Sequence, residues 1–347
     1  MRAQQTREQV LSQVLKISHR QAPKPGASPY IPLTLRGLMA GERLTFTLYL
    51  KVSESQGDGF KYFPYLEIGE ILDVKWLTPL QKMDISSLYF KREDLQGVLA
   101  YLNNHLQLLE VAGPPQTKMK LNVMGEHLNL TLRQAFAAPR LGPHIHLARQ
   151  EIDRIIKEFK NDISSLKIVW GILSRSYSLY NHSVNVCLLA VAMMLFLEKS
   201  RGDSRLMGLA ALFHDLGMTR VSEEILYKSG ELDSIELAET REHPTTGMQM
   251  LKSHAAVPLD AVRLVWEHHE NAVGSGYPQG LSLNRQHPWT RVLRLLDAYD
   301  ALTTYRLYRP IYSPFAALKY LQAQEGPHGP IFDPHTLKSF IRFLAIS

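Results

Sequence analysis

Residues 31–109 show the period of two that is typical of β-strands. Four apolar residues alternate there with threonine, tyrosine and lysine: Leu44, Phe46, Leu48 and Leu50. A second short apolar stretch, residues 85–90, precedes residues 92–102, in which apolar side chains recur on one helical face. We therefore expect a small α/β module in this part of the chain.

From about residue 145 onward the apolar positions follow a helical rhythm, and no segment has a convincing strand pattern. The helical segments lie at residues 152–159, 184–197, 257–267 and 291–302. This spacing predicts an all-α bundle. The longest apolar run, residues 186–197, is shorter than the roughly 20 residues of a bilayer span and therefore predicts a buried helix. The expected fold class is α+β overall, with the α/β module first and the helical bundle second.

Proline and glycine breaks divide the chain further, because such residues punctuate regular structure. The expected segments are a flexible N-terminal segment at 1–30, a small α/β module of regulatory type at 31–109, a linker with one helix near residues 121–136 at 110–145, and the helical domain at 146–347.

Composition narrows the class of protein without identifying it. A hydrophobic content of 45% with 21% charged residues is ordinary for a globular protein. The net charge of +6 suits a phosphate-bearing ligand, but no block of lysine and arginine predicts nucleic-acid binding. The N-terminus has no apolar signal segment, so we expect a cytoplasmic protein without membrane attachment. The single cysteine, Cys187, excludes an intramolecular disulfide and predicts a core thiol.

The doublet His214-Asp215 ends an apolar helical segment with two adjacent side chains of the kind that bind metals. Any one of the 14 histidines could be a surface or hydrogen-bonded core residue, so a lone histidine is weak evidence. An adjacent imidazole and carboxylate buried without a partner would cost several kcal/mol, roughly, and a bound cation removes that penalty. The doublet therefore predicts a metal site.

Other candidate ligands lie at or near apolar helical segments, as in metal sites built inside helical bundles. Together with the doublet they make seven candidates: His182, His214, Asp215, His243, His268, His269 and Asp297. Seven ligands exceed what one tetrahedral or octahedral ion uses, so two ions fit better, with Asp215 as the bridge. Imidazole and carboxylate ligands suit iron or manganese and do not exclude zinc. A pair of ions about 3.5–4 Å apart favours displacement at phosphorus, which implies phosphoester hydrolysis.

The segment from about residue 165 to 340 resembles the HD-GYP family of HD-domain phosphohydrolases. The resemblance rests on these motifs: His182-Ser183, His214-Asp215-Leu216-Gly217, His243-Pro244, the segment from His268-His269-Glu270 to Gly276-Tyr277-Pro278, Asp297 with Asp300, and Phe332-Asp333-Pro334. It implies that His214 and Asp215 form the catalytic pair of a metal-dependent enzyme that hydrolyses cyclic di-GMP to pGpG, GMP or both. Asp300 is then expected to act beside the ligands.

The resemblance also implies residues for substrate and partners. Arg306 and Arg309 match the basic residues that follow the last metal ligand of the family, here Asp297, and they are expected to hold the phosphates of the substrate. Two solvated arginines after a helix would give the same pattern. Gly276, Tyr277 and Pro278 are expected at the substrate or in contact with a signalling protein such as a diguanylate cyclase, and a homodimer is compatible with the family. The N-terminal module resembles regulatory domains, and its ligand is not indicated.

Three departures from the family pattern change the expectations. Met218 stands where the family has a lysine that helps to hold a phosphate, so reduced activity is expected. Val273-Gly274 replaces an Asp-Gly pair, which changes the hydrogen bonding of the loop. Ser178 replaces a glutamate that holds a third ion in some relatives, which favours a dinuclear centre. The alternative function is a receptor or interaction module that keeps the metal site without turnover.

Overall fold

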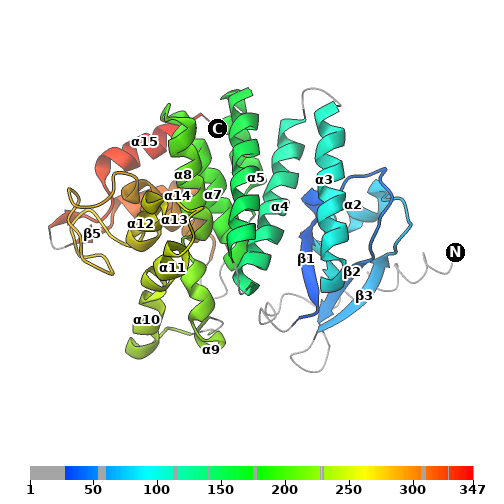
Figure 1. Cartoon of the computed structure of the whole chain (residues 1–347), viewed down its shortest axis with the longest axis horizontal. Coiled ribbons are helices and arrows are strands. Elements are labelled where there is room, and N and C mark those ends of the chain that lie inside the picture. Colours follow the sequence, from blue (N-terminus) through cyan, green and yellow to red (C-terminus); the bar gives the residue numbers. More distant parts are fainter. Residues whose placement is uncertain are drawn as a thin grey trace. The chain divides into compact units, whose positions relative to one another are not determined.

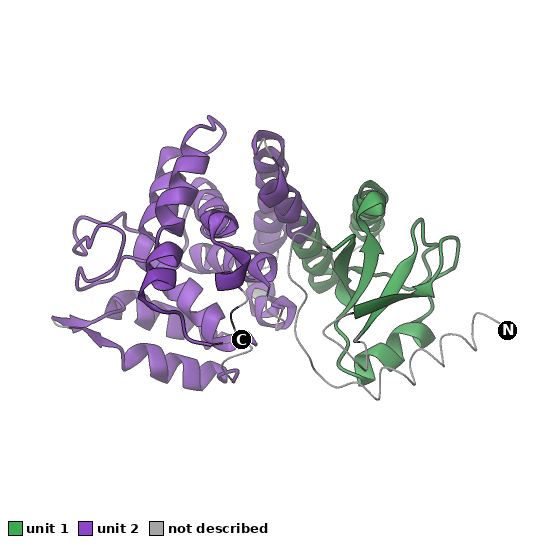
Figure 2. Cartoon of the chain, turned by 90° about the horizontal axis from the view of Figure 1, so that it is seen from below, with its two compact units in different colours: residues 1–127 green, residues 128–347 purple. Residues whose placement is uncertain are grey.

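The computed structural model describes residues 28–53, 60–111, 116–138, 141–161, 163–174, 178–226, 228, 230–305, 310–326 and 328–346. Contacts between residues divide the chain into two compact units, residues 1–127 and 128–347, which are coloured separately in Figure 2. The boundary falls inside α4 (Thr117–Ala137), the helix expected near residues 121–136.

The first unit is built on a four-stranded antiparallel sheet in the order β1-β4-β2-β3. Its elements are β1 (Tyr30–Thr34), β2 (Leu48–Ser53), β3 (Phe60–Leu66), α2 (Val74–Lys82), β4 (Ser87–Lys91) and α3 (Leu95–Val111), with short 3-10 turns at η1 (Leu35–Gly37) and η2 (Arg92–Asp94). Phe46 lies near Phe90 of β4 and Tyr101 of α3, with ring centroids 6.2 and 5.5 Å away. One face of the sheet and α3 therefore share a core.

The alternating residues of this unit are buried as predicted, but the strand begins later than the alternation. The four apolar side chains are at most 1% exposed: Leu44, Phe46, Leu48 and Leu50. Only the last two belong to β2, and the preceding segment is tied down by an isolated bridge from Arg43 to Ile71. The period of two thus identified the buried face correctly, but it did not show that the hydrogen-bonded strand begins only at Leu48.

The second unit is helical, as the sequence predicts (Figure 1). Its helices are α5 (Gly142–Asn161), α6 (Val169–Ile172), α7 (Leu179–Phe196), α8 (Arg201–Phe213), α9 (Glu223–Leu226), α10 (Ser234–Arg241), α11 (His243–Lys252), α12 (Leu259–Glu267), α13 (Thr290–Thr303), α14 (Pro314–Gln322) and α15 (Pro334–Leu344). Two 3-10 segments, η3 (Ile163–Ile168) and η4 (Leu216–Arg220), and a two-residue pair, β5 (Glu325–Gly326) and β6 (Gly329–Pro330), complete it. Asp333 caps α15 by accepting a hydrogen bond from the Thr336 N–H.

Helix α7 is the central helix of this unit, and it packs against α5, α8 and α13. Ser178 caps it by accepting a hydrogen bond from the Asn181 N–H. Among the described helices, α7 has the length and mean hydropathy, 1.6, of a membrane span, yet 78% of it is buried inside the protein. Cys187 in its middle is fully buried, which confirms the predicted core thiol.

Candidate metal centre

The seven candidate ligands come from five places in the helical unit. His182 lies in the first turn of α7, His214 and Asp215 follow α8, and His243 is the first residue of α11. His268 and His269 follow the last residue of α12, and Asp297 lies in the middle of α13. A Cβ at Gly217 would overlap the carbonyl oxygen of His243, so glycine permits the close approach of η4 to α11 that brings Asp215 and His243 together.

The two carboxylate oxygens of Asp215 face different pairs of histidines. Oδ2 lies 3.4 Å from Nε2 of His214 and 3.8 Å from Nε2 of His182. Oδ1 lies 3.3 Å from Nε2 of His243 and 3.9 Å from Nε2 of His268. Asp297 joins the first pair, since its Oδ1 lies 3.1 Å from Nε2 of His182. This arrangement offers one donor set on each side of a shared carboxylate.

In four of the five candidate ligand histidines, Nδ1 lies against an oxygen: a carboxylate oxygen of Asp300 at His182, and a backbone carbonyl at each of the other three. Three backbone carbonyls take Nδ1–H at 2.6–2.7 Å: Ala211 from His214, Thr240 from His243 and Val265 from His268. Because a neutral imidazole has one donor and one acceptor nitrogen, these bonds leave a lone pair on Nε2. Three rings are therefore oriented so that the nitrogen facing Asp215 can bind a cation.

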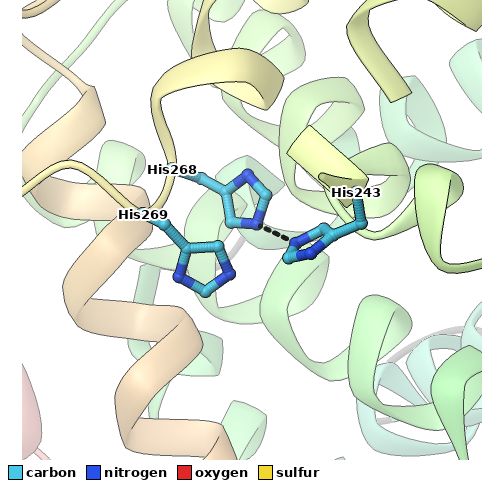
Figure 3. Close-up of side chains that lie close together, drawn as sticks. All are labelled: His243, His268 and His269. Carbon is cyan, nitrogen blue, oxygen red and sulfur yellow. Dashed lines mark hydrogen bonds between the residues drawn. The ribbon is translucent and has the colours of Figure 1, made fainter. Parts of the chain in front are cut away.

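One orphaned atom tests whether a cation fits. Nε2 of His214 is buried and has no hydrogen-bond partner among the residues that the structure describes. Two groups of side chains have ligand atoms within 4.8 Å of one another: His182 with His214 and Asp215, and His243 with His268 and His269. The second group is drawn in Figure 3, where the three rings turn toward a common centre. Imidazole and carboxylate donors at this spacing fit a transition-metal ion.

The pKa values of His268 and Asp215 favour the forms that bind metals, whereas the pKa of His182 favours its protonated form. Burial, followed by the nearby His214 and His243, lowers the pKa of His268 to about 3. Burial alone would raise the pKa of Asp215, but the surrounding histidines, led by His214, hold it below its usual range. Burial also opposes a charge on His182, yet its bonds to Asp297 and Asp300 raise its pKa to about 10. A cation at Nε2 of His182 would displace that proton.

The signature loop, the segment that carries Gly276, Tyr277 and Pro278, lies against the second group of histidines. The ring of Tyr277 stacks on His269, with centroids 4.6 Å apart and planes 19° from parallel. A Cβ at Gly276 would lie 2.5 Å from the carbonyl oxygen of His269, so this position requires glycine for the loop to approach. Pro278 is exposed. In the loop, the Asn271 side chain accepts from the Val273 and Ser275 N–H groups.

Two predicted residues, Arg306 and Arg309, lie outside the described residues. The site also contains two residues that the sequence motifs did not indicate, Asn185 and Arg294. Asn185 donates a 2.8 Å hydrogen bond to Asp300, whose other oxygen meets His182. Arg294 lies 3.2 Å from Nδ1 of His269, measured from Nη1. Its spacing of three residues before Asp297 on a helix was a usable signal, because residues at i and i+3 share a face.

Comparison with known proteins identifies the class of the helical unit. Residues 171–334 match the model of a family described as HD domain. The structure of an HDG"Y"P protein from Bdellovibrio bacteriovorus has a TM-score of 0.71 at 18% identity, covering 91% of this chain and 99% of that one. That likeness is one of fold.

Two curated relatives carry functional names. A cyclic di-GMP phosphodiesterase of Pseudomonas aeruginosa is 30% identical over 244 residues, which are 68% of this chain and 58% of the relative. A 3'3'-cGAMP-specific phosphodiesterase of Vibrio cholerae is 37% identical over 100 residues, 29% of this chain and 22% of that protein. The helical unit is thus an HD domain. These matches agree with the resemblance of its motifs to the HD-GYP family, and the chain spans little more than half the length of the Pseudomonas relative.

Proposed function

We propose that this chain is a cytoplasmic, metal-dependent phosphodiesterase that hydrolyses cyclic di-GMP to pGpG, GMP or both in bacterial second-messenger signalling. The observation that carries the proposal is the position of Asp215, whose Oδ1 lies 3.3 Å from His243 and whose Oδ2 lies 3.4 Å from His214. A carboxylate facing two donor sets is the arrangement expected of a bridging ligand. The names of the Pseudomonas and Vibrio relatives support a cyclic dinucleotide as substrate.

The proposed ligand sets share Asp215. One ion, iron or manganese, would be held by His182, His214, Asp215 and Asp297, and the second by Asp215, His243, His268 and His269. Bound there, the two ions would activate water and neutralise the charge that develops at phosphorus. The protein's part is orientation: carbonyls and Asp300 hold the rings, and the helices exclude bulk water from buried His214 and His268.

The substrate is proposed to enter beside the Tyr277 and His269 stack, where the signature loop meets the ligands. Gly276, Tyr277 and Pro278 would border it, and Arg306 with Arg309 would hold its phosphates. The exposed Pro278 also gives the loop a surface for a signalling partner such as a diguanylate cyclase. Met218, half-buried in η4, leaves the position of the family lysine without a cation, and slower turnover is the expected result.

The test is metal analysis of anaerobically purified protein combined with identification of products from cyclic di-GMP and from 3'3'-cGAMP. We expect two ions per chain and pGpG or GMP from cyclic di-GMP. Asp215→Ala should lose metal and activity, whereas Asp260→Ala, at an exposed position on α12, should keep both. Metal-loaded protein that binds cyclic di-GMP without cleaving it would overturn the proposal in favour of the receptor. Cleavage of 3'3'-cGAMP but not of cyclic di-GMP would overturn the assignment of cyclic di-GMP as the substrate.

A further inference from the structure

Arg294 stands at the edge of the metal centre with much of its hydrogen-bonding capacity uncommitted. It lies on α13, and its Nη1 is 3.2 Å from Nδ1 of His269 and 3.5 Å from Oδ2 of Asp297. Its Nε is buried and has no hydrogen-bond partner among the described residues. The side chain is 25% exposed, so the guanidinium is reachable from solvent as well as from the ligands.

The contact between Arg294 and His269 conflicts with metal binding by that histidine. A guanidinium is always charged and has donors only, so Nδ1 of His269 must accept its hydrogen. A neutral imidazole has a single acceptor nitrogen. His269 therefore cannot accept from Arg294 and present a lone pair to a cation at the same time. When His269 acts as a ligand, Arg294 must release it.

The released guanidinium would remain beside the signature loop. The ring of Tyr277 stacks on His269. The guanidinium of Arg241 lies 5.4 Å from the centre of the Tyr277 ring. The stack is thus flanked by two arginines, of which Arg294 is the one that reaches the ligands. A planar guanidinium with five donors matches the oxygens of a phosphate.

We propose that Arg294 binds a non-bridging phosphate oxygen of the substrate and supplies the cation that Met218 lacks. The inference rests on the proposed function for the identity of the substrate. Arg294 then makes one of two contacts at a time. It donates to His269 while that histidine binds no metal ion, and it donates to the phosphate once His269 has become a ligand. The arginine is a substrate-binding residue in this scheme, and the ligand histidines are oriented without it.

Binding of GMP to the metal-loaded protein tests the proposal without relying on turnover, since GMP has a phosphate but no diester. Loss of a hydrogen bond to a charged group corresponds to about a 10- to 100-fold weaker affinity. We expect this loss in Arg294→Ala and Arg294→Gln by calorimetry, with a smaller loss in Arg294→Lys. Guanosine, which has no phosphate, should bind the wild type and Arg294→Ala equally.

The matched control is Arg149→Ala, which removes the same charge from an exposed position on α5, a helix without ligands. It should bind GMP like the wild type. Metal content should be unchanged or higher in Arg294→Ala, because a competing donor to His269 is gone. Adding Met218→Lys to Arg294→Ala should recover much of the lost affinity and lower KM for cyclic di-GMP.

Three results would overturn the inference. Unchanged GMP affinity in both Arg294→Ala and Arg294→Gln would show that the arginine does not hold phosphate, and loss of metal in both would show a structural role. The proposed function fails separately: if the wild type cleaves no cyclic dinucleotide, the GMP comparison still decides the role of Arg294. If the wild type cleaves cyclic di-GMP and the Arg294 variants have the same KM for it, the role of Arg294 is rejected while the proposed function stands.

Discussion

Nδ1 of His182 lies 2.7 Å from Oδ2 of Asp300, on the side of the ring opposite to the nitrogen that faces Asp215. The other oxygen of Asp300 accepts a 2.8 Å hydrogen bond from Asn185. Carboxylates in this position fix the orientation of a ligand histidine and raise its basicity. We therefore expect Asp300 to position His182 in the first donor set.

Replacing Asp300 by alanine should weaken metal binding while leaving the fold intact. Loss of such a carboxylate costs about 10- to 100-fold in metal affinity. Competition between the protein and a coloured chelator for Mn²⁺ measures this loss. Asp260→Ala, which removes an exposed carboxylate from α12, serves as the control and should match the wild type. Equal affinities for Asp300→Ala and wild type would reject the positioning role.

Removing ligands from one side of Asp215 should remove one ion. His243 faces only Oδ1 of Asp215, so His243→Ala should lower the metal content from two ions per chain to one. Asp215→Ala should lower it to none, because both donor sets lose their shared carboxylate. Elemental analysis of the purified variants gives the stoichiometry, with His146→Ala on the surface of α5 as the control. A single ion in the wild type would contradict a dinuclear centre.

The signature loop depends on the fully buried carboxylate of Glu270. This carboxylate accepts the N–H groups of Gln279 and Leu281 at 2.7 and 2.8 Å. In Glu270→Gln the amide group can accept only one of them, and the unsatisfied donor should cost about 1–3 kcal/mol. Urea unfolding measures the loss, and amide exchange should rise at Gln279 and Leu281. Unaltered exchange would contradict this role, and Glu231→Gln at the surface is the control.

Lys51 should destabilise the first unit at neutral pH. Its Nζ lies 3.6 Å from the centre of the Phe60 ring, and burial lowers its pKa from 10.5 to about 8. The folded state thus holds the proton less tightly than the unfolded state. The penalty is complete below pH 8, and stability rises with pH from about 8 to 10.5 as the penalty is lost.

Lys51→Met should therefore raise the melting temperature at pH 7 by about 2–4 °C, after allowance for solvent screening and for the lost contact with Phe60. The advantage should shrink as the pH rises toward 10.5. Calorimetry at several pH values measures it. Lys118→Met, at an exposed position on α4, should show no such pH dependence. An advantage for Lys51→Met that is independent of pH would contradict burial of the ammonium group as the cause.

Residue identity alone selected the seven candidate ligands, which the structure brings close together. His214, Asp215 and the other five candidates could be chosen because adjacent ligand side chains at the ends of apolar helices are costly unless a partner is present. The helical period likewise predicted α7 and its burial, since a fully apolar helix must lie in a core. These inferences use local information, which a sequence carries directly.

Tertiary structure decided the rest, because the distances concerned join residues that are far apart in the chain. That Oδ1 of Asp215 faces His243 while Oδ2 faces His214 follows from the contact of η4 with α11, which no local pattern specifies. The contact of Arg294 with His269 depends in the same way on how α13 packs beside the end of α12. The sequence by itself determined which side chains can bind metal; only the packing of the helices decided which atoms face one another.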